Sequence, residues 1–227
     1  MAKRRAGPAQ RQPPRLDDER TERRGDELDD HELLEDVEWT GGAAGSVVGV
    51  EIVRSRLTGI TFTGLELRDL RLLDVELVEC ELSGAVLTGA RWERVVLRHC
   101  RMSGVVAAEL RAVDVRLQDC KADQAWLRAS RLDRCEVVDT DLSGADLYGA
   151  SVRRSAFRRC DLTGVDVSAS EFDEVSLHGS TIDRMKGAES LQRVTIGSEQ
   201  LVPLALPILA ARSITVDDEP PDLVDSR

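Results

Sequence analysis

Four of the five cysteines recur in one register, because Cys80, Cys100, Cys120 and Cys160 are separated by 20, 20 and 40 residues. A regular set of thiols could bind zinc or form disulfides. A zinc site needs ligands that converge tetrahedrally on one point, whereas a constant interval places each thiol at the same position of a repeating unit. We interpret these four thiols and Cys135 as small, free core residues. We therefore expect no metal and no cofactor.

Other residues that could support catalysis are few and far apart. The three histidines are His31, His99 and His178, and the last two lie 79 residues apart, about four coils of the repeat described below, too far to cooperate. The phosphate-binding G-x-x-x-x-G-K-[ST], nucleophile G-x-S-x-G and zinc-protease H-E-x-x-H patterns do not occur in the sequence. We therefore do not expect an enzyme.

The strongest pattern is a period of five residues. In ELSGAVLTGARWERVVLRHCRMSG (81–104) a bulky apolar residue recurs every five positions, and a smaller one precedes it by two. The same register gives 27 apolar centres from Ile52 to Ile182. An α-helix would wrap such a stripe around its cylinder, and a flat strand would send alternate centres to opposite faces. The period fits a coil in which each unit is one short strand and one turn.

The segments DLSGADLYGA (141–150) and DLTGV (161–165) resemble the A-(D/N)-L-x-x consensus of pentapeptide-repeat proteins, which are bacterial. The resemblance implies an all-β fold, a right-handed quadrilateral β-helix with four pentapeptides per coil. Residues 45–186 would then form about seven coils with a 20-residue period. Two columns agree with that period: the cysteines described above, and the glycines Gly64, Gly84, Gly104, Gly144 and Gly164. Bulky Trp92 is followed one coil later by Ala112, which predicts that core volume balances along the axis.

The flanks differ from the repeat. We expect residues 1–25 to be a disordered basic arm and residues 26–44 an N-terminal cap with a short helix, whose face carries Leu28, Leu34 and Val37. Residues 187–216 should form a helical C-terminal cap, since an open β-helix end exposes core and unpaired backbone. As in several family members, this segment could also form a homodimer through Leu201, Leu204, Leu206, Ile208 and Leu209. Residues 217–227 should be a disordered acidic tail.

The charge distribution bears on one function that the resemblance implies. Quinolone-resistance members of the family are acidic rods that bind DNA gyrase in place of DNA and protect it from topoisomerase inhibitors. The chain has a net charge of −11, but residues 45–186 hold 20 basic and 23 acidic residues. Such a rod is nearly neutral, which disfavours mimicry of a phosphate backbone. The candidate acidic surface for this alternative is Asp141, Asp146, Asp161 and Asp166.

A basic column reads Arg71, Arg91, Arg111 and Arg131. Acidic residues are interleaved with it, namely Asp74, Glu93, Asp114 and Asp133. We therefore interpret this face as solvated and of mixed charge, and we do not expect direct binding of nucleic acid.

An outward apolar column is the better functional signal. It reads Val86, Val106 and Trp126, and Ala108 and Tyr148 lie on the next outward column. A contiguous apolar patch with aromatic residues is typical of a contact surface, although incidental exposure would give the same pattern.

We therefore hypothesise a non-enzymatic binding or scaffold module that acts in protein–protein interaction. The sequence does not identify its partner. A terminal appendage of a larger enzyme complex is a further alternative. No apolar run is long enough to span a membrane and no secretory signal is visible, so we expect a cytoplasmic protein.

Overall fold

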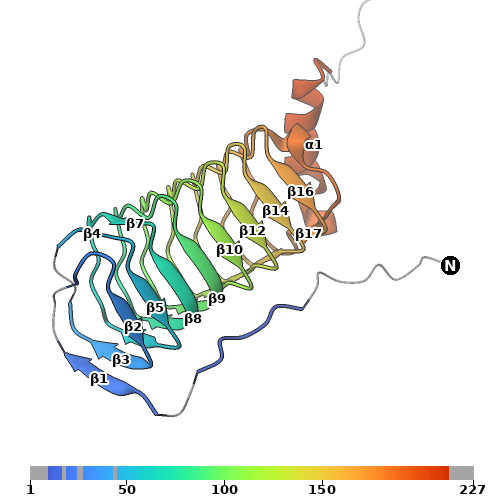
Figure 1. The fold of residues 1–227 in the computed structure, drawn as a ribbon. Coiled ribbons are helices and arrows are strands. Elements are labelled where there is room, and N and C mark those ends of the chain that lie inside the picture. The colour runs from blue at the N-terminus through green and yellow to red at the C-terminus, as the bar shows by residue number, and fades with distance from the viewer. Residues whose placement is uncertain (1–9, 17–18, 25–27, 43–44, 215–227) are drawn as a thin grey trace, which may run out of the picture.

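The computed structural model describes residues 10–16, 19–24, 28–42 and 45–214. They form a parallel β-solenoid of about eight turns with one α-helix at its C-terminal end (Figure 1). The predicted β-helix is thus confirmed, with one more turn than the sequence indicated. The tail predicted at residues 217–227 lies outside the described residues.

Each coil has four sides, which we name by the apolar centres of one coil: first (Leu72), second (Leu77), third (Leu82) and fourth (Leu87). The first and second sides carry regular strands, and single β-bridges join the coils on most of the third and fourth. The first-side strands are β2 (Leu33–Glu35), β5 (Glu51–Val53), β10 (Arg111–Val113), β12 (Arg131–Asp133), β14 (Ser151–Arg153) and β16 (Glu171–Asp173). The second-side strands are β1 (Thr21–Arg24), β3 (Val37–Thr40), β6 (Arg56–Thr58), β11 (Arg116–Gln118), β13 (Glu136–Val138), β15 (Ala156–Arg158), β17 (Val175–Ser176) and β18 (Val194–Thr195).

Two longer strands, β8 (Arg71–Val78) and β9 (Arg91–Arg98), turn the corner and belong to both sides. The short strands β4 (Val47–Val48) and β7 (Leu67–Arg68) pair on the fourth side. Between these strands the register advances by 20 residues, as in Leu72 with Trp92. Four pentapeptides per coil explain that step.

Side chains two apart on each side point into the core, as the five-residue pattern predicted. All five cysteines are buried and free. The Sγ of Cys80 lies 3.5 Å from the backbone oxygen of Leu57, and the Sγ of Cys100 lies 3.6 Å from that of Leu77. Burial raises the pKa of the Cys135 thiol to about 12. The thiols therefore act as small core residues that also contact the backbone of the preceding coil.

The prediction of an N-terminal helical cap is wrong. Residues 33–35 and 37–40 form β2 and β3, which pair with β5 and β6 and add a coil to the solenoid. Leu34 and Trp39 are five apart and buried, so they follow the repeat. The register to the next coil is 18 residues instead of 20, as in Leu34 with Ile52. This two-residue shortening put the segment out of phase with the rest of the repeat. Leu28 and Val37 are also buried, but in the solenoid core.

The described part of residues 1–25 is ordered, so the prediction of a disordered arm is wrong there. Residues 10–16 run alongside the solenoid, and residues 21–24 form β1, which pairs with β3 (Figure 1). Residues 1–9 of that arm lie outside the described part of the chain.

The C-terminal segment closes the last coil. It contains the short 3-10 helices η1 (Ala188–Ser190) and η2 (Ser198–Gln200), followed by α1 (Leu201–Ala211). The buried side chain of Gln200 donates from Nε2 to the backbone oxygens of Leu177 and Ser180, at 2.7 and 2.6 Å. Its Oε1 accepts from the N–H of Gly197 at 2.8 Å. Gln200 thus satisfies the carbonyl of Ser180 at the end of the rod and adds a second bond to that of Leu177, which also accepts the N–H of Ser180.

The predicted helical C-terminal cap is present, and Leu191, Val194, Ile196 and Leu204 pack against the core there. Of the helices in the described residues, none has the length and apolar character needed to cross a bilayer.

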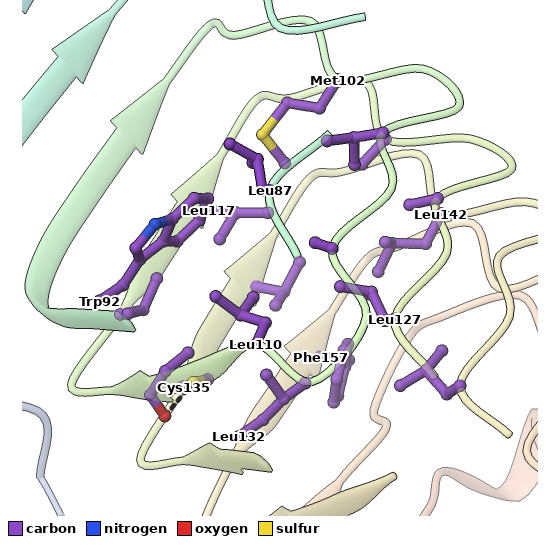
Figure 2. Close-up of a pocket in the computed structure, with 18 residues that line it drawn as sticks. Leu87, Trp92, Met102, Leu110, Leu117, Leu127, Leu132, Cys135, Leu142 and Phe157 are labelled. Atoms are coloured by element: carbon purple, nitrogen blue, oxygen red, sulfur yellow. Dashed lines mark hydrogen bonds between the residues drawn. The ribbon is translucent and has the colours of Figure 1, made fainter. Parts of the chain in front are cut away.

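The core contains a small apolar cavity of about 70 Å³. Figure 2 shows Trp92, Met102 and Leu87 among the side chains around it, and Ala107, Ala112 and Ala122 also line it. Ala112 pairs with Trp92 in the adjacent coil, as expected. The volume balance is incomplete, however, because three of the four consecutive apolar centres from Ala107 to Ala122 are alanine.

Candidate functional site

The fourth side carries the predicted apolar column. Val86 bridges to Val106, Val106 to Trp126, and Trp126 to Asp146, which is the 20-residue register of the coil. Val86, Val106 and the neighbouring Ala108 are half-buried. The column is therefore continuous, but its exposed part lies at Trp126.

The two aromatic side chains on this side are strongly exposed. Trp126 is 55% and Tyr148 is 50% exposed, although large aromatic rings are usually buried. Arg128 lies between them, with its Cζ 6.0 Å from the ring centroid of Trp126 and 5.8 Å from that of Tyr148. Both distances allow a cation–π interaction. We name Trp126, Arg128 and Tyr148 the aromatic cluster.

Asp146 fixes the aromatic cluster. Its Oδ2 lies 2.6 Å from Nε of Arg128, and its Oδ1 accepts the backbone N–H of Tyr148 at 3.0 Å. One carboxylate thus orients the guanidinium and the backbone that carries the tyrosine. The cluster is held in place on rigid coils, which reduces the entropy that a partner would have to remove on binding.

Arg128 was missed by the sequence analysis, although the register contained the signal. Ala108, Arg128 and Tyr148 occupy the same position in three successive coils. The apolar pattern includes Ala108 and Tyr148 but not Arg128, because arginine is charged.

The four aspartates of the candidate acidic surface lie in two neighbouring pairs. Asp141 bridges to Asp161 on the third side, and Asp146 bridges to Asp166 on the fourth. Each also accepts the backbone N–H two residues ahead, as Asp141 does from Ser143 and Asp161 from Thr163, both at 2.9 Å. Such bonds close the turn of each pentapeptide. These carboxylates therefore have a structural role whether or not a partner uses them.

The electrostatics around Asp166 follow from its neighbours. Burial tends to raise the pKa of Asp166, but bonds from the Ser168 hydroxyl and backbone N–H, with Lys186 and Arg128 nearby, lower it overall. Lys186 bridges to Asp166, and Lys121 bridges to Asp141. A lysine therefore ends the acidic stretch in each column.

Helix α1 carries the residues predicted for dimerisation. Leu201 and Leu206 are exposed, whereas Leu204, Ile208 and Leu209 are half-buried. Val202, which the sequence analysis did not select, is 69% exposed. No residue of α1 is buried, so the helix covers the end of the rod with only part of its apolar surface.

Among the described residues, no group of three or more His, Cys, Asp or Glu side chains is arranged to hold a metal ion. A family model described as pentapeptide repeats matches eight copies within residues 76–106, 113–147 and 140–179. The chain is a pentapeptide-repeat protein. The assignment rests on that match together with the five-residue sides and 20-residue coils of the structure. Pentapeptide-repeat proteins are in general non-catalytic scaffolds.

Solved structures with the same repeat are similar at low identity. A trypsin-treated form of QnrB1, a plasmid-mediated fluoroquinolone resistance protein, is 18% identical, with 85% of this chain and 100% of that chain covered and a TM-score of 0.37. HetL, a pentapeptide-repeat protein involved in heterocyst differentiation regulation from the cyanobacterium Nostoc sp. strain PCC 7120, is 15% identical, with 73% and 87% covered and a TM-score of 0.29. Comparison with curated proteins gives no match.

Proposed function

We propose that this pentapeptide-repeat protein is a cytoplasmic, non-enzymatic module that binds a protein partner through the aromatic cluster on its fourth side. The observation that carries the proposal is the pair of exposed rings, Trp126 and Tyr148, on either side of Arg128. Trp, Tyr and Arg are the residue types most enriched among those that dominate binding energy at protein interfaces. Their rigid mounting through Asp146 favours the same role.

The proposal predicts a loss of binding when the cluster is disrupted. Trp126→Glu should weaken capture of the partner by about 2 kcal/mol or more, as for a central interface residue. Because Trp126 is an exposed side chain, the same change should alter the free energy of unfolding by only about 0.5 kcal/mol. The measurement is affinity capture from a lysate of the source organism, followed by titration with the purified partner.

Val113→Glu is a suitable control. Val113 is a half-buried residue of β10 on the first side, so the substitution introduces the same charge away from the cluster. It should leave binding unchanged. Equal loss of binding in Trp126→Glu and Val113→Glu would exclude the aromatic cluster as the contact surface.

A second candidate is a DNA mimic that binds DNA gyrase and protects it from topoisomerase inhibitors. The adjacent pairs Asp141–Asp161 and Asp146–Asp166 favour it, since each pair places two carboxylates side by side. Binding should then fall steeply with salt. Asp141→Asn/Asp161→Asn tests this candidate cleanly, because asparagine can still close each turn and the contact between Arg128 and Asp146 stays intact. If purified gyrase binds and only the acidic substitutions weaken it, mimicry replaces the aromatic cluster as the functional surface.

We also propose that the protein forms a homodimer through α1. Leu201, Val202 and Leu206 are exposed on α1, and apolar side chains of this kind can meet their copies across a two-fold axis. Val202→Glu/Leu206→Glu leaves the packing of Leu204 on the core intact. Sedimentation should give a dimer for the wild type and a monomer for the variant. An unchanged mass per particle would refute the dimer without bearing on the aromatic cluster.

A further inference from the structure

Residues 10–16 lie along the corner between the first and second sides of the solenoid (Figure 1). The backbone N–H of Gln12 donates to Oδ1 of Asp114 at 3.1 Å, and the N–H of Arg15 donates to Oδ1 of Asp74 at 2.9 Å. These bonds join residues 102 and 59 positions apart in the chain. The segment is thus seated on the corner by its backbone.

The register of these two bonds follows from the two prolines between them. Pro13 and Pro14 have no N–H, so the N–H groups of Gln12 and Arg15 are the two that this four-residue stretch offers, and both are used. Consecutive prolines favour the polyproline II conformation, in which three residues advance about 9.3 Å. Asp74 and Asp114 are two coils apart, which is about 9.6 Å at the spacing of neighbouring strands. The pitch of the peptide therefore matches two coils of the rod.

The two carboxylates are held ready by the rod itself. Asp114 has a φ of 58° at the corner and is buried, and both of its oxygens accept from Arg134 of the next coil at 2.8 Å. Asp74 is bound in the same way by Arg94, at 2.6 and 2.8 Å. Each Oδ1 has a further lone pair, which the arm uses. Such bidentate pairs fix the carboxylate plane, so the acceptors do not depend on the arm for their orientation.

A third contact is an ion pair without a hydrogen bond, since the buried Nε of Arg11 has no hydrogen-bond partner among the described residues. Arg11 is only 12% exposed at its side chain, and its Nε lies 3.7 Å from Oε2 of Glu136. Its Nη1 also approaches the backbone oxygen of Asp114, at 3.5 Å. Glu136 pairs at the same time with Arg116, at 3.2 Å. The corner thus provides an acidic position for the residue immediately before Gln12.

We propose that this corner is a binding groove for an extended, basic, proline-containing peptide of the form Arg-x-Pro-Pro-x, and that residues 10–16 occupy it as an intramolecular ligand. A protein partner that presents such a segment binds by displacing the arm. Asp114 and Asp74 bind two backbone N–H groups of the peptide, which two prolines separate, and Glu136 binds its guanidinium. The groove lies away from the fourth side, which carries the aromatic cluster, and its occupancy can be tested independently.

The test uses full-length protein with a weakened arm. Pro13→Gly/Pro14→Gly removes the polyproline preference of the arm and leaves the groove unchanged. A fluorescent peptide with the sequence of residues 10–16, blocked at both ends, is titrated with wild-type and variant protein, and its anisotropy is measured. The variant should bind the peptide at least about ten-fold more tightly than the wild type, since the tethered arm of the wild type competes at an effective concentration in the millimolar range.

Two matched controls make the result specific. Glu136→Gln in the arm-weakened protein should reduce binding several-fold, whereas Asp139→Asn, another ion-paired carboxylate that follows β13, should not. A peptide with both prolines replaced by glycine should bind at least about ten-fold more weakly. Absence of peptide binding to the arm-weakened protein would overturn the proposal and leave the arm a purely structural segment. Binding that is insensitive to Glu136→Gln and to the proline replacement would overturn it as well, because it would reflect charge alone.

Discussion

Replacing Ala112 by valine should stabilise the protein, because Ala112 lines the core cavity of about 70 Å³. The two added carbon groups contribute about 1.6 kcal/mol if they are fully buried, at about 0.8 kcal/mol each. The cavity itself costs about 1.7 kcal/mol at about 24 cal/mol per Å³. These are two estimates of the same gain in stability, one from the buried carbon groups and one from the cavity volume, and they are not added. We therefore expect Ala112→Val to raise the free energy of unfolding by about 1–2 kcal/mol.

Thermal and chemical unfolding of the full chain measure this change. For a domain of this size about 1 kcal/mol shifts Tm by about 2–4 °C, so Tm should rise by about 2–8 °C. Ala90→Val is the matched control, since Ala90 is equally buried but does not line the cavity. Overpacking should make Ala90→Val destabilising by about 1–3 kcal/mol. If Ala112→Val destabilises the protein as much as Ala90→Val does, the space beside Ala112 is not available and the reasoning is refuted.

Trp92→Ala should enlarge the same cavity and lower the free energy of unfolding by about 3–5 kcal/mol, and an unchanged denaturation midpoint would contradict its place in the core. Burial opposes ionisation of Asp114, but Arg134 and the N–H of Gln12 outweigh it and lower the pKa of Asp114. Its stabilising contribution should therefore be complete above the unfolded-state pKa of about 3.9 and be lost as the pH falls through its lower folded-state pKa; a carboxyl NMR titration with a midpoint above about 3.9 would show the opposite sign. Because burial raises the pKa of Cys135 to about 12, this thiol should not react with a thiol-specific reagent in the native protein, and fast reaction without denaturant would place it at the surface.

The fold was predictable from the sequence where the repeat keeps its phase. From Ile52 to Ile182 every fifth residue is apolar, and each such position meets its equivalent one coil later. Burial of the two inward positions in such a solenoid follows from the place of a residue within its pentapeptide, whereas the burial of outward residues such as Val96 and Asp114 depends on their neighbours. The phase changes by two residues before Ile52. Leu34 and Val37, three apart, then fitted one face of a helix equally well.

The candidate site was predictable only in part. The 20-residue register placed Trp126 and Tyr148 on outward columns, and both are exposed. The position of Arg128 between the rings depends on its rotamer and on Asp146, which spacing alone does not determine. The docking of residues 10–16 could not be predicted from composition, because it depends on backbone N–H groups and not on side-chain type.

The bonds of Gln200 to the last coil have a consequence for the growth of the rod. A stack of parallel strands that ends in free carbonyls is a template to which any extended chain can add, and repeated addition produces a fibril. Gln200 takes up the acceptors of Leu177 and Ser180 with a side chain, which presents no new strand edge in return. Templated addition is thereby blocked at these two acceptors, whereas β16, whose one partner among the described strands is β14, keeps an open outer edge. The sides of the rod differ from this end, because the sequence of each coil differs from the next and recognition there can be specific.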